Sequence, residues 1–458
     1  MDLFSLIVGA GGGGLLSNLL GRTREYRKDV HGAADLLAWE AVVGEGLLVQ
    51  RDGALVAGWR YAGPDMKSAT VHERNALAGR INEALLPFAS GWMFHFDAVR
   101  RPAADYPERC AFPDPLTRLI EEERRQSYQE RDESGQYRFY ETEYTLVATY
   151  LPPKEVYERL GTFFVRGAAL ERGVARAIDA CIEQFEGAAR GLEARLGALL
   201  TMERLTTAEL LRHLHFTLTG HRHAIRVPNA GYSLNAYLAD QEVYGGFKPR
   251  VGGRHIRVVA LHGFPDATYQ GVLDAVHNYA GAYRWSNRII MLSDEEAGRL
   301  LRERRQVWFN KWRGLSSLIS ALLGSEKSER AKATEEELFK DGDAFAMTKD
   351  VTQALRRIAS STARYCLFTS SIVIIEDKEG RAEETARGLL KLLHEAGFPA
   401  RVETVNAFEA YLGSLPGHGW PNLRRNVLHT RNIADLIPAT KVWAGASSNP
   451  SSYFPPES

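Results

Sequence analysis

Apolar and polar positions form strand-like and helix-like patterns in turn along the first third of the chain. Asp52-Gly53 separates two apolar runs and predicts a hairpin, because an Asp-Gly pair supplies the positive φ that a tight turn needs. The elements predicted next are a helix over 68–88, a buried strand over 92–99, a charged helix over 116–130 and an alternating strand over 137–151.

The same kind of pattern returns in the second half of the chain. Strands are predicted over 255–261, 283–292, 365–377 and 400–405, and helices over 267–280, 293–312 and 382–396. The mixed-charge stretch 315–361 is predicted to be a helical insertion. Without it, the order of strands and helices is that of a ferredoxin-like split βαβ unit.

These patterns predict the α+β class, with ferredoxin-like split βαβ units, mostly antiparallel sheets, a central helical segment and a helical insertion. The chain has 458 residues, enough for roughly three domains or subdomains at ~150 residues each. The predicted segments are an apolar Gly-rich leader over 1–30, an α/β subdomain over 31–153, a mostly helical segment over 154–245, a ferredoxin-like α/β subdomain over 246–440 that contains the insertion, and a Ser/Pro-rich linker over 441–458.

The apolar composition of the leader makes contact with a membrane one hypothesis for this segment. Residues 3–20 carry no charge and Arg22 and Arg24 follow, but five glycines within 9–14 weaken the stretch as a helix. Basic residues after the apolar run fit a cleaved signal peptide poorly and suit an anchor whose C-terminal side stays cytoplasmic. Three hypotheses stay open: peripheral or partner-assisted membrane contact, a flexible leader packed on protein, and a true span.

The amino-acid composition argues against several classes of protein. Apolar residues make up 45% and charged residues 25%, which indicates a folded protein. The 57 Lys and Arg residues balance 57 Asp and Glu residues, and a net charge of zero argues against a dedicated nucleic-acid binder. Cys110, Cys181 and Cys366 form no CxxC pair, so a disulfide framework and a cysteine-based zinc site are not expected.

No nucleotide or hydrolase motif is present in the sequence. There is no GxxxxGK[ST] phosphate loop, no GxSxG and no HExxH. Around Gly21-Arg22-Thr23, Leu16 stands where the first glycine of a phosphate loop belongs and Arg22 replaces the lysine. We therefore predict no catalytic and no cofactor-binding residues in this chain.

Four histidines, His213, His215, His221 and His223, lie close together in the sequence. An HxH pair on a strand can bind a metal ion, but the pattern around His213 is helical, where residues i and i+2 diverge. No nearby acid completes a ligand set, so we predict no metal site. The aromatic and basic run 308–313 is typical of an amphipathic helix packing on its own domain or a partner, although nucleic acid or lipid could also stack there.

Several short stretches, in order across residues ~35–456, are similar to a known family, the TrbE-type conjugal transfer proteins (CagE/TrbE/VirB family), which are ATPases of type IV secretion systems. The matching stretches are Gly63-Pro64-Asp65 followed by Ser68-Ala69-Thr70, Arg100 to Pro107, Phe112 to Pro115, Tyr283-Arg284-Trp285-Ser286, Gly413 to Gly419, and Asn432 to Pro438. In that family the RecA-like motor with its Walker motifs follows the region matched here. The resemblance therefore predicts an N-terminal region that lacks the motor, so that ATP and Mg²⁺ belong only to the motor and no cofactor binds here.

The resemblance implies a non-catalytic scaffold and docking region of a conjugation ATPase. Its expected partners are other inner-membrane components of the secretion system and its own copies, at the cytoplasmic face of the bacterial inner membrane, with no direct nucleic-acid binding. The alternative is a nucleotide-dependent, ATP-binding enzyme with an unrecognised site. A third hypothesis, a DNA-handling module, is disfavoured by the zero net charge.

Overall fold

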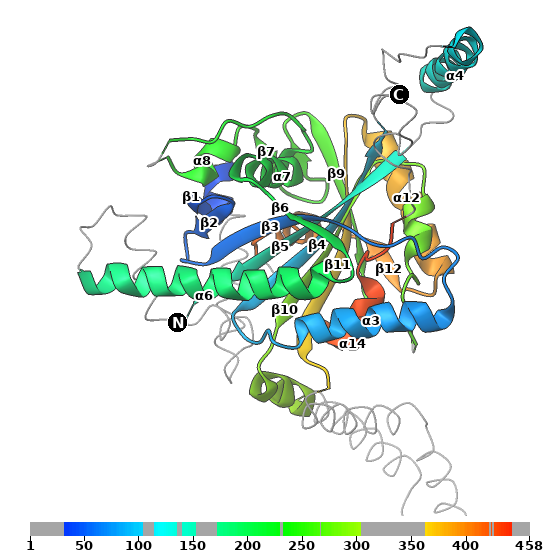
Figure 1. The fold of residues 1–458 in the computed structure, drawn as a ribbon. Coiled ribbons are helices and arrows are strands. Elements are labelled where there is room, and N and C mark those ends of the chain that lie inside the picture. The colour runs from blue at the N-terminus through cyan, green and yellow to red at the C-terminus, as the bar shows by residue number, and fades with distance from the viewer. Residues whose placement is uncertain are drawn as a thin grey trace, which may run out of the picture.

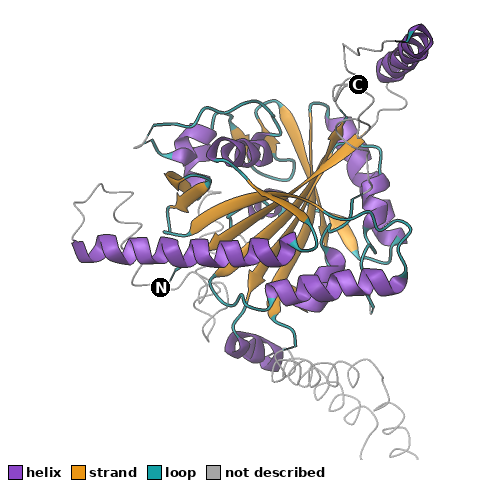
Figure 2. Cartoon of the chain, viewed as in Figure 1, coloured by secondary structure: helices purple, strands orange, loops and turns teal. Residues whose placement is uncertain are grey.

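The computed structural model describes residues 32–103, 114–134, 140–152, 172–229, 232–265, 267–303, 362–420, 423 and 426–441. Within these ranges the strands form one twisted sheet, and helices pack against it (Figure 1, Figure 2). Every strand pairing in the described residues is antiparallel. The predicted α+β class with mostly antiparallel pairing is confirmed.

One half of the sheet is a ferredoxin-like unit, which we call the N-terminal unit (β3 to β6). Its sheet order is β6-β3-β5-β4, which is 4-1-3-2 in chain order, with α3 and α6 as the two crossovers. A hairpin precedes it and α4 interrupts it. The elements are η1 (Ala33–Leu36), β1 (Trp39–Gly44), β2 (Leu47–Gln50), β3 (Leu55–Ala62), α3 (Val71–Leu85), β4 (Trp92–Pro102), α4 (Pro115–Ser134), β5 (Tyr140–Tyr150), α6 (Arg172–Gly197) and β6 (Thr201–Arg204).

The other half, which we call the C-terminal unit (β9 to β12), repeats this topology. Its sheet order is β12-β9-β11-β10, again 4-1-3-2 in chain order. Its elements, and those around it, are α7 (Thr207–Thr219), α8 (Leu234–Leu238), β7 (Val243–Tyr244), β8 (Arg250–Val251), β9 (Arg254–Leu261), η2 (Asp274–Asn278), β10 (Tyr283–Met291), β11 (Tyr365–Glu376), α12 (Glu379–Glu395), β12 (Ala400–Val402), α13 (Ala407–Gly413), β13 (Asn426–His429) and α14 (Thr430–Leu436). The predicted split βαβ unit is confirmed here, since Ile256 on β9 pairs with Ile375 on β11.

The two units join edge to edge through β4 and β10. These strands run antiparallel, from Tyr283 opposite Arg100 to Ile290 opposite Met93, and each is the second strand of its unit. An approximate two-fold axis therefore relates the units. A helix follows this strand in each unit: α4 follows β4, and a helix over 294–303 follows β10 at the opposite end of the sheet (Figure 1).

Opposite faces of the sheet are covered by different sets of helices. The crossover helices α3, α6 and α12 pack through Leu85, Phe185 and Leu389 into one apolar core on one face. On the other face α7, α8 and α13 form a second core that includes Leu214 and Tyr411. Burial at ~25 cal/mol per Å² of apolar surface makes these two layers the main stabilising contribution.

Local signals explain several element boundaries. The helix predicted to start at Ser293 does so, because the Glu296 backbone N–H donates to Ser293 Oγ (3.2 Å) and the Ser293 N–H donates to the Glu296 carboxylate (2.8 Å). The turn glycine Gly53 has φ of 81° between β2 and β3, as the predicted hairpin requires. Gly397 has φ of 80° directly after α12.

One predicted element is wrong and another is too long. The helix predicted over 267–280 is only the short 3-10 helix η2, because Gly271 takes φ of 88° and interrupts any longer helix. The strand predicted over 400–405 ends at Val402. The strand β6 lies inside the segment 154–245 that was predicted as mostly helical, and it completes the N-terminal unit.

Several predictions fall outside the described residues: the leader over 1–30, the insertion over 315–361, the aromatic run over 308–313 and residues 442–458. Among the helices that the structure describes, none combines the length and the apolarity needed to cross a membrane.

Candidate functional site

Charged side chains are buried where the two units meet. We call this cluster the charged seam: the buried residues His95 and Asp97 on β4 and Arg284 and Arg288 on β10, together with the half-buried His213 on α7. Side chains alternate between the two faces of a strand, so these residues lie opposite the apolar core of α3, α6 and α12. Asp97 Oδ2 is 3.3 Å from Arg284 Nη1 and 3.4 Å from His213 Nε2.

The two arginines hold the turn that follows α13. Arg284 donates to the carbonyl oxygen of Ser414 (2.8 Å) and to its hydroxyl (2.7 Å). Arg288 donates to the carbonyl oxygens of Gly413 (2.9 Å) and His418 (3.2 Å). These charge-assisted hydrogen bonds fix residues 413–418 against the centre of the sheet.

The first hairpin binds the same turn from its other side. Trp39 Nε1 donates to the carbonyl oxygen of Pro416, and Gln50 Nε2 donates to that of Gly417, both at 2.9 Å. Gly417 has φ of 84°, and a Cβ there would lie 2.2 Å from Gln50 Nε2. The turn therefore requires glycine at this position.

Burial and charge set the protonation states in the seam. Burial would raise the pKa of Asp97, but the positive charge of Arg284 and the nearby His213 imidazole outweigh it and lower the pKa below its ordinary value. Burial lowers the pKa of His95 to about 3 and that of His418 to about 4. Asp97 is thus ionised and these two histidines are neutral near pH 7.

Two further ion pairs lie between the charged seam and the protein surface. A small cavity of about 40 Å³ lies beside His213. On its rim, Arg60 pairs with Glu209 at 2.8 Å and Arg222 pairs with Glu143 at 2.8 Å. These pairs and the hydrogen bonds of the two arginines of the charged seam fit a structural role in holding α7 and α13 on the sheet.

Motifs that are far apart in the sequence meet in the structure. The Tyr283-to-Ser286 stretch meets the Gly413-to-Gly419 stretch through Arg284 and Ser414. The Gly63-to-Asp65 stretch meets residues 438–441: Tyr61 OH donates to the carbonyl oxygen of Pro438 (2.8 Å), and the Lys441 N–H donates to that of Pro64 (3.2 Å). Two more matching stretches lie wholly or partly outside the described residues, because 104–113 are not described.

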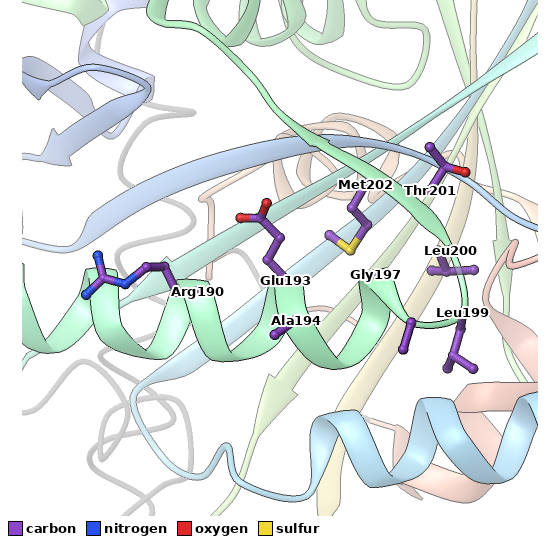
Figure 3. Close-up of a pocket in the computed structure, with 9 residues that line it drawn as sticks. Arg190, Glu193, Ala194, Gly197, Leu199, Leu200, Thr201 and Met202 are labelled. Carbon is purple, nitrogen blue, oxygen red and sulfur yellow. The ribbon is translucent and has the colours of Figure 1, made fainter.

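An open groove of about 860 Å³ lies between the end of α6 and β6 (Figure 3). Arg190 and Glu193 are the charged residues among those that line it, and Glu193 also accepts a hydrogen bond from Trp59 Nε1 (3.2 Å). The lining residues are Arg190, Glu193, Ala194, Gly197, Ala198, Leu199, Leu200, Thr201 and Met202. They include one carboxylate, Glu193, and one hydroxyl, Thr201, and no histidine, cysteine or serine.

Among the four neighbouring histidines, His213 and His215 face different partners in the structure. His213 faces Asp97 in the seam, whereas His215, two residues on, faces Asp240, as the divergence of helical i and i+2 positions predicts. His223 returns to His215, with ring centroids 4.7 Å apart. The sequence analysis missed Asp240, which lies 25 residues from His215 and is brought to it by the fold.

Comparison with known proteins gives the class of this fold. A family model described as the N-terminal domain of the type IV secretion system ATPase VirB4/TrbE matches residues 46–156. A second model, described as the CagE, TrbE, VirB family, component of type IV transporter system, matches residues 323–424. These two matches indicate similarity to the VirB4/TrbE class of type IV secretion proteins.

Individual relatives narrow the class to a family. The chain is 33% identical over 451 residues to the conjugal transfer protein TrbE of Rhizobium radiobacter, covering 95% of this chain and 52% of that protein. It is 41% identical over 131 residues to a shorter protein of Sinorhizobium fredii, described as a probable conjugal transfer protein TrbE, covering 28% of this chain and 85% of that protein. The S. fredii relative, covered over most of its length, shows that the chain belongs to the TrbE family. The chain spans about half the length of the R. radiobacter relative.

Proposed function

We propose that this chain is a scaffold and docking region of a TrbE-type conjugation ATPase, acting in assembly of the type IV secretion system rather than in ATP hydrolysis. The observation that carries the proposal is the match to a VirB4/TrbE N-terminal domain over 46–156, on a fold whose buried charges hold structural turns together. The sequence contains no GxxxxGK[ST] phosphate loop, which agrees with a role outside hydrolysis.

The proposed partners are inner-membrane components of the secretion system and further copies of the chain. The insertion helix α4 supports protein docking, because Leu116 and Leu119 are each 67% exposed and Ile120 is 50% exposed on it. Neighbouring apolar side chains exposed on one helix are typical of an interaction surface. The chain would work at the cytoplasmic face of the inner membrane, with the leader as the proposed contact.

Competition with the complete ATPase tests the docking role. A region that docks but cannot power transport should occupy the binding places of the full-length protein and form inactive assemblies by mass action. Donor cells that overproduce residues 1–458 should therefore transfer DNA less efficiently. Deletion of residues 1–21 should weaken both recovery with membranes and inhibition. Unchanged transfer at high expression, with the chain absent from membranes, would contradict the proposal.

Nucleotide binding separates this proposal from an ATP-dependent enzyme. We expect neither binding nor hydrolysis of Mg-ATP by the purified chain, since no phosphate-cradling loop is present in the sequence. Calorimetry with Mg-ATP, together with a turnover assay against a buffer blank, makes the measurement. Micromolar binding with turnover would establish the enzyme alternative.

A further inference from the structure

The end of α7 and the chain after α8 bring three metal-binding residues together. α7 ends at Thr219, and Gly220, with φ of 72°, reverses the chain so that His223 comes back beside His215. Asp240 arrives from the segment after α8. One nitrogen of each imidazole and one oxygen of the carboxylate lie within 4.8 Å of one another.

His215 is fixed by contacts on its other side. It is buried, and the Thr219 hydroxyl donates to the His215 carbonyl oxygen (3.0 Å) and accepts from the His221 backbone N–H (3.1 Å). The same oxygen lies 3.4 Å from His215 Nδ1. Orientation of a histidine through its second ring nitrogen is typical of metal ligands.

With Nδ1 beside the Thr219 hydroxyl, the other ring nitrogen of His215 faces Asp240. His215 Nε2 lies 3.0 Å from Asp240 Oδ1. An imidazole nitrogen and a carboxylate oxygen this close to one another are two ligands that one metal ion can take together.

His223 adds a third ligand to this pair. A metal ion would use both rings and the carboxylate as ligands. His223 and the Asp240 carboxylate are exposed, so an ion can reach them and water can take a further coordination position.

We propose that His215, His223 and Asp240 form a binding site for a divalent transition-metal ion of the zinc type. Two imidazole nitrogens and one carboxylate oxygen suit Zn²⁺, whereas Mg²⁺ and Ca²⁺ prefer ligand sets made of oxygen. This proposal departs from the sequence-based prediction of no metal, which rested on the divergence of helical i and i+2 positions and on the absence of an acid near the histidines. The site is independent of the proposed docking function.

Zn²⁺ titration of the full chain against a chromophoric chelator tests the site. We expect one Zn²⁺ per chain, with the affinity weakened at least about tenfold in His223→Ala and in Asp240→Asn. His221→Ala is the matched control, because His221 is an exposed histidine of the same loop and no member of the cluster. It should change the affinity less than about twofold.

Co²⁺ substitution and thermal unfolding give independent readouts. Bound Co²⁺ should produce visible absorption in the wild type and in His221→Ala, and it should be lost in His223→Ala. Zn²⁺ should raise the unfolding temperature of the wild type, because a ligand that binds the folded state stabilises it. Circular dichroism of His223→Ala without metal checks that the fold is kept. The proposal is overturned if Zn²⁺ does not bind at micromolar concentration, or if both cluster variants bind it as tightly as the wild type.

Discussion

The two ferredoxin-like units share a strand order but differ in what connects the strands. The first crossover of the N-terminal unit is α3, a helix of 15 residues, whereas that of the C-terminal unit is η2, a 3-10 helix of 5 residues. α3 begins with a complete capping box at Thr70 and Glu73, whereas Gly271 interrupts the equivalent segment. Both units have the same sheet order. The strands therefore pair in this order even where the first crossover is not a regular α-helix.

The units also differ in the charges that they bring to their shared edge. β4 of the N-terminal unit carries His95 and Asp97, whereas β10 of the C-terminal unit carries Arg284 and Arg288. A guanidinium group stays charged at every ordinary pH, whereas histidine and aspartate titrate. The two strands are therefore complementary, and two copies of either one would bring like charges together at this edge.

The largest expected effect comes from removing the charge across this edge. Arg284→Met leaves Asp97 buried without its guanidinium partner and should lower the free energy of unfolding by about 3–5 kcal/mol, measured by urea denaturation. Arg60→Met is the control, since Arg60 is 41% exposed and pairs at the surface; it should cost about 0.2–1 kcal/mol. If Asp97→Leu combined with Arg284→Met costs the sum of the single changes, the pair is not coupled.

Acid should destabilise the protein through three buried histidines whose pKa is lowered by burial: His95, at about 3, and His277 and His418, each at about 4. The pKa of His95 is about 3 in the folded protein against 6.5 ordinarily, so below pH 6.5 the unfolded chain binds a proton that the folded protein does not. This stability is present above pH 6.5 and is lost as the pH falls towards 3, with roughly 2 kcal/mol lost between pH 7 and pH 5. The lowered pKa of Asp97 adds a loss in the same direction at lower pH.

His95→Phe tests this assignment. The variant should flatten the fall in the free energy of unfolding between pH 7 and pH 5 by roughly 2 kcal/mol, because phenylalanine binds no proton. Urea denaturation series at several pH values for variant and wild type make the measurement. Superimposable pH profiles would show that His95 is not the source of the acid sensitivity.

A smaller effect on the free energy of unfolding is expected at the starts of α3 in the N-terminal unit and α12 in the C-terminal unit. The Thr70 side chain accepts from the Glu73 N–H at the start of α3, whereas Lys378 at the start of α12 makes no capping hydrogen bond with its side chain. Thr70→Ala should therefore cost about 1 kcal/mol of stability and Lys378→Ala close to zero. If the two variants lose the same free energy of unfolding, the Thr70 cap does not explain why the first crossover of the N-terminal unit is a regular helix.

The smallest expected effect on stability is at the insertion of the N-terminal unit. Leu119 on α4 is 67% exposed, so Leu119→Ser should change the free energy of unfolding by no more than about 0.5 kcal/mol. The proposed docking surface predicts that the same change weakens inhibition of transfer by the overproduced chain. If the variant keeps normal stability and still inhibits transfer as strongly as the wild-type chain, α4 is not part of the proposed docking surface.

Sequence reasoning succeeded where the signal lies within a few residues. The Ser293 helix start, the Asp52-Gly53 hairpin and the end of α12 near Gly397 each depend on neighbours at most a few positions away. The second split βαβ unit followed from the order of these elements. The N-terminal unit was harder to see, because its fourth strand β6 is only 4 residues long and lies between α6 and α7.

Local periodicity, turn residues and short motifs were enough to establish the α+β class, most strands and helices, the C-terminal ferredoxin-like topology and the family. Only the folded molecule reveals that β4 joins β10, that Asp97 meets Arg284 across 187 positions, and that Asp240 approaches His215. The physical reason is that a buried charge or a ligand set depends on partners brought together by packing of the whole sheet, and residue spacing carries no information about such distant contacts.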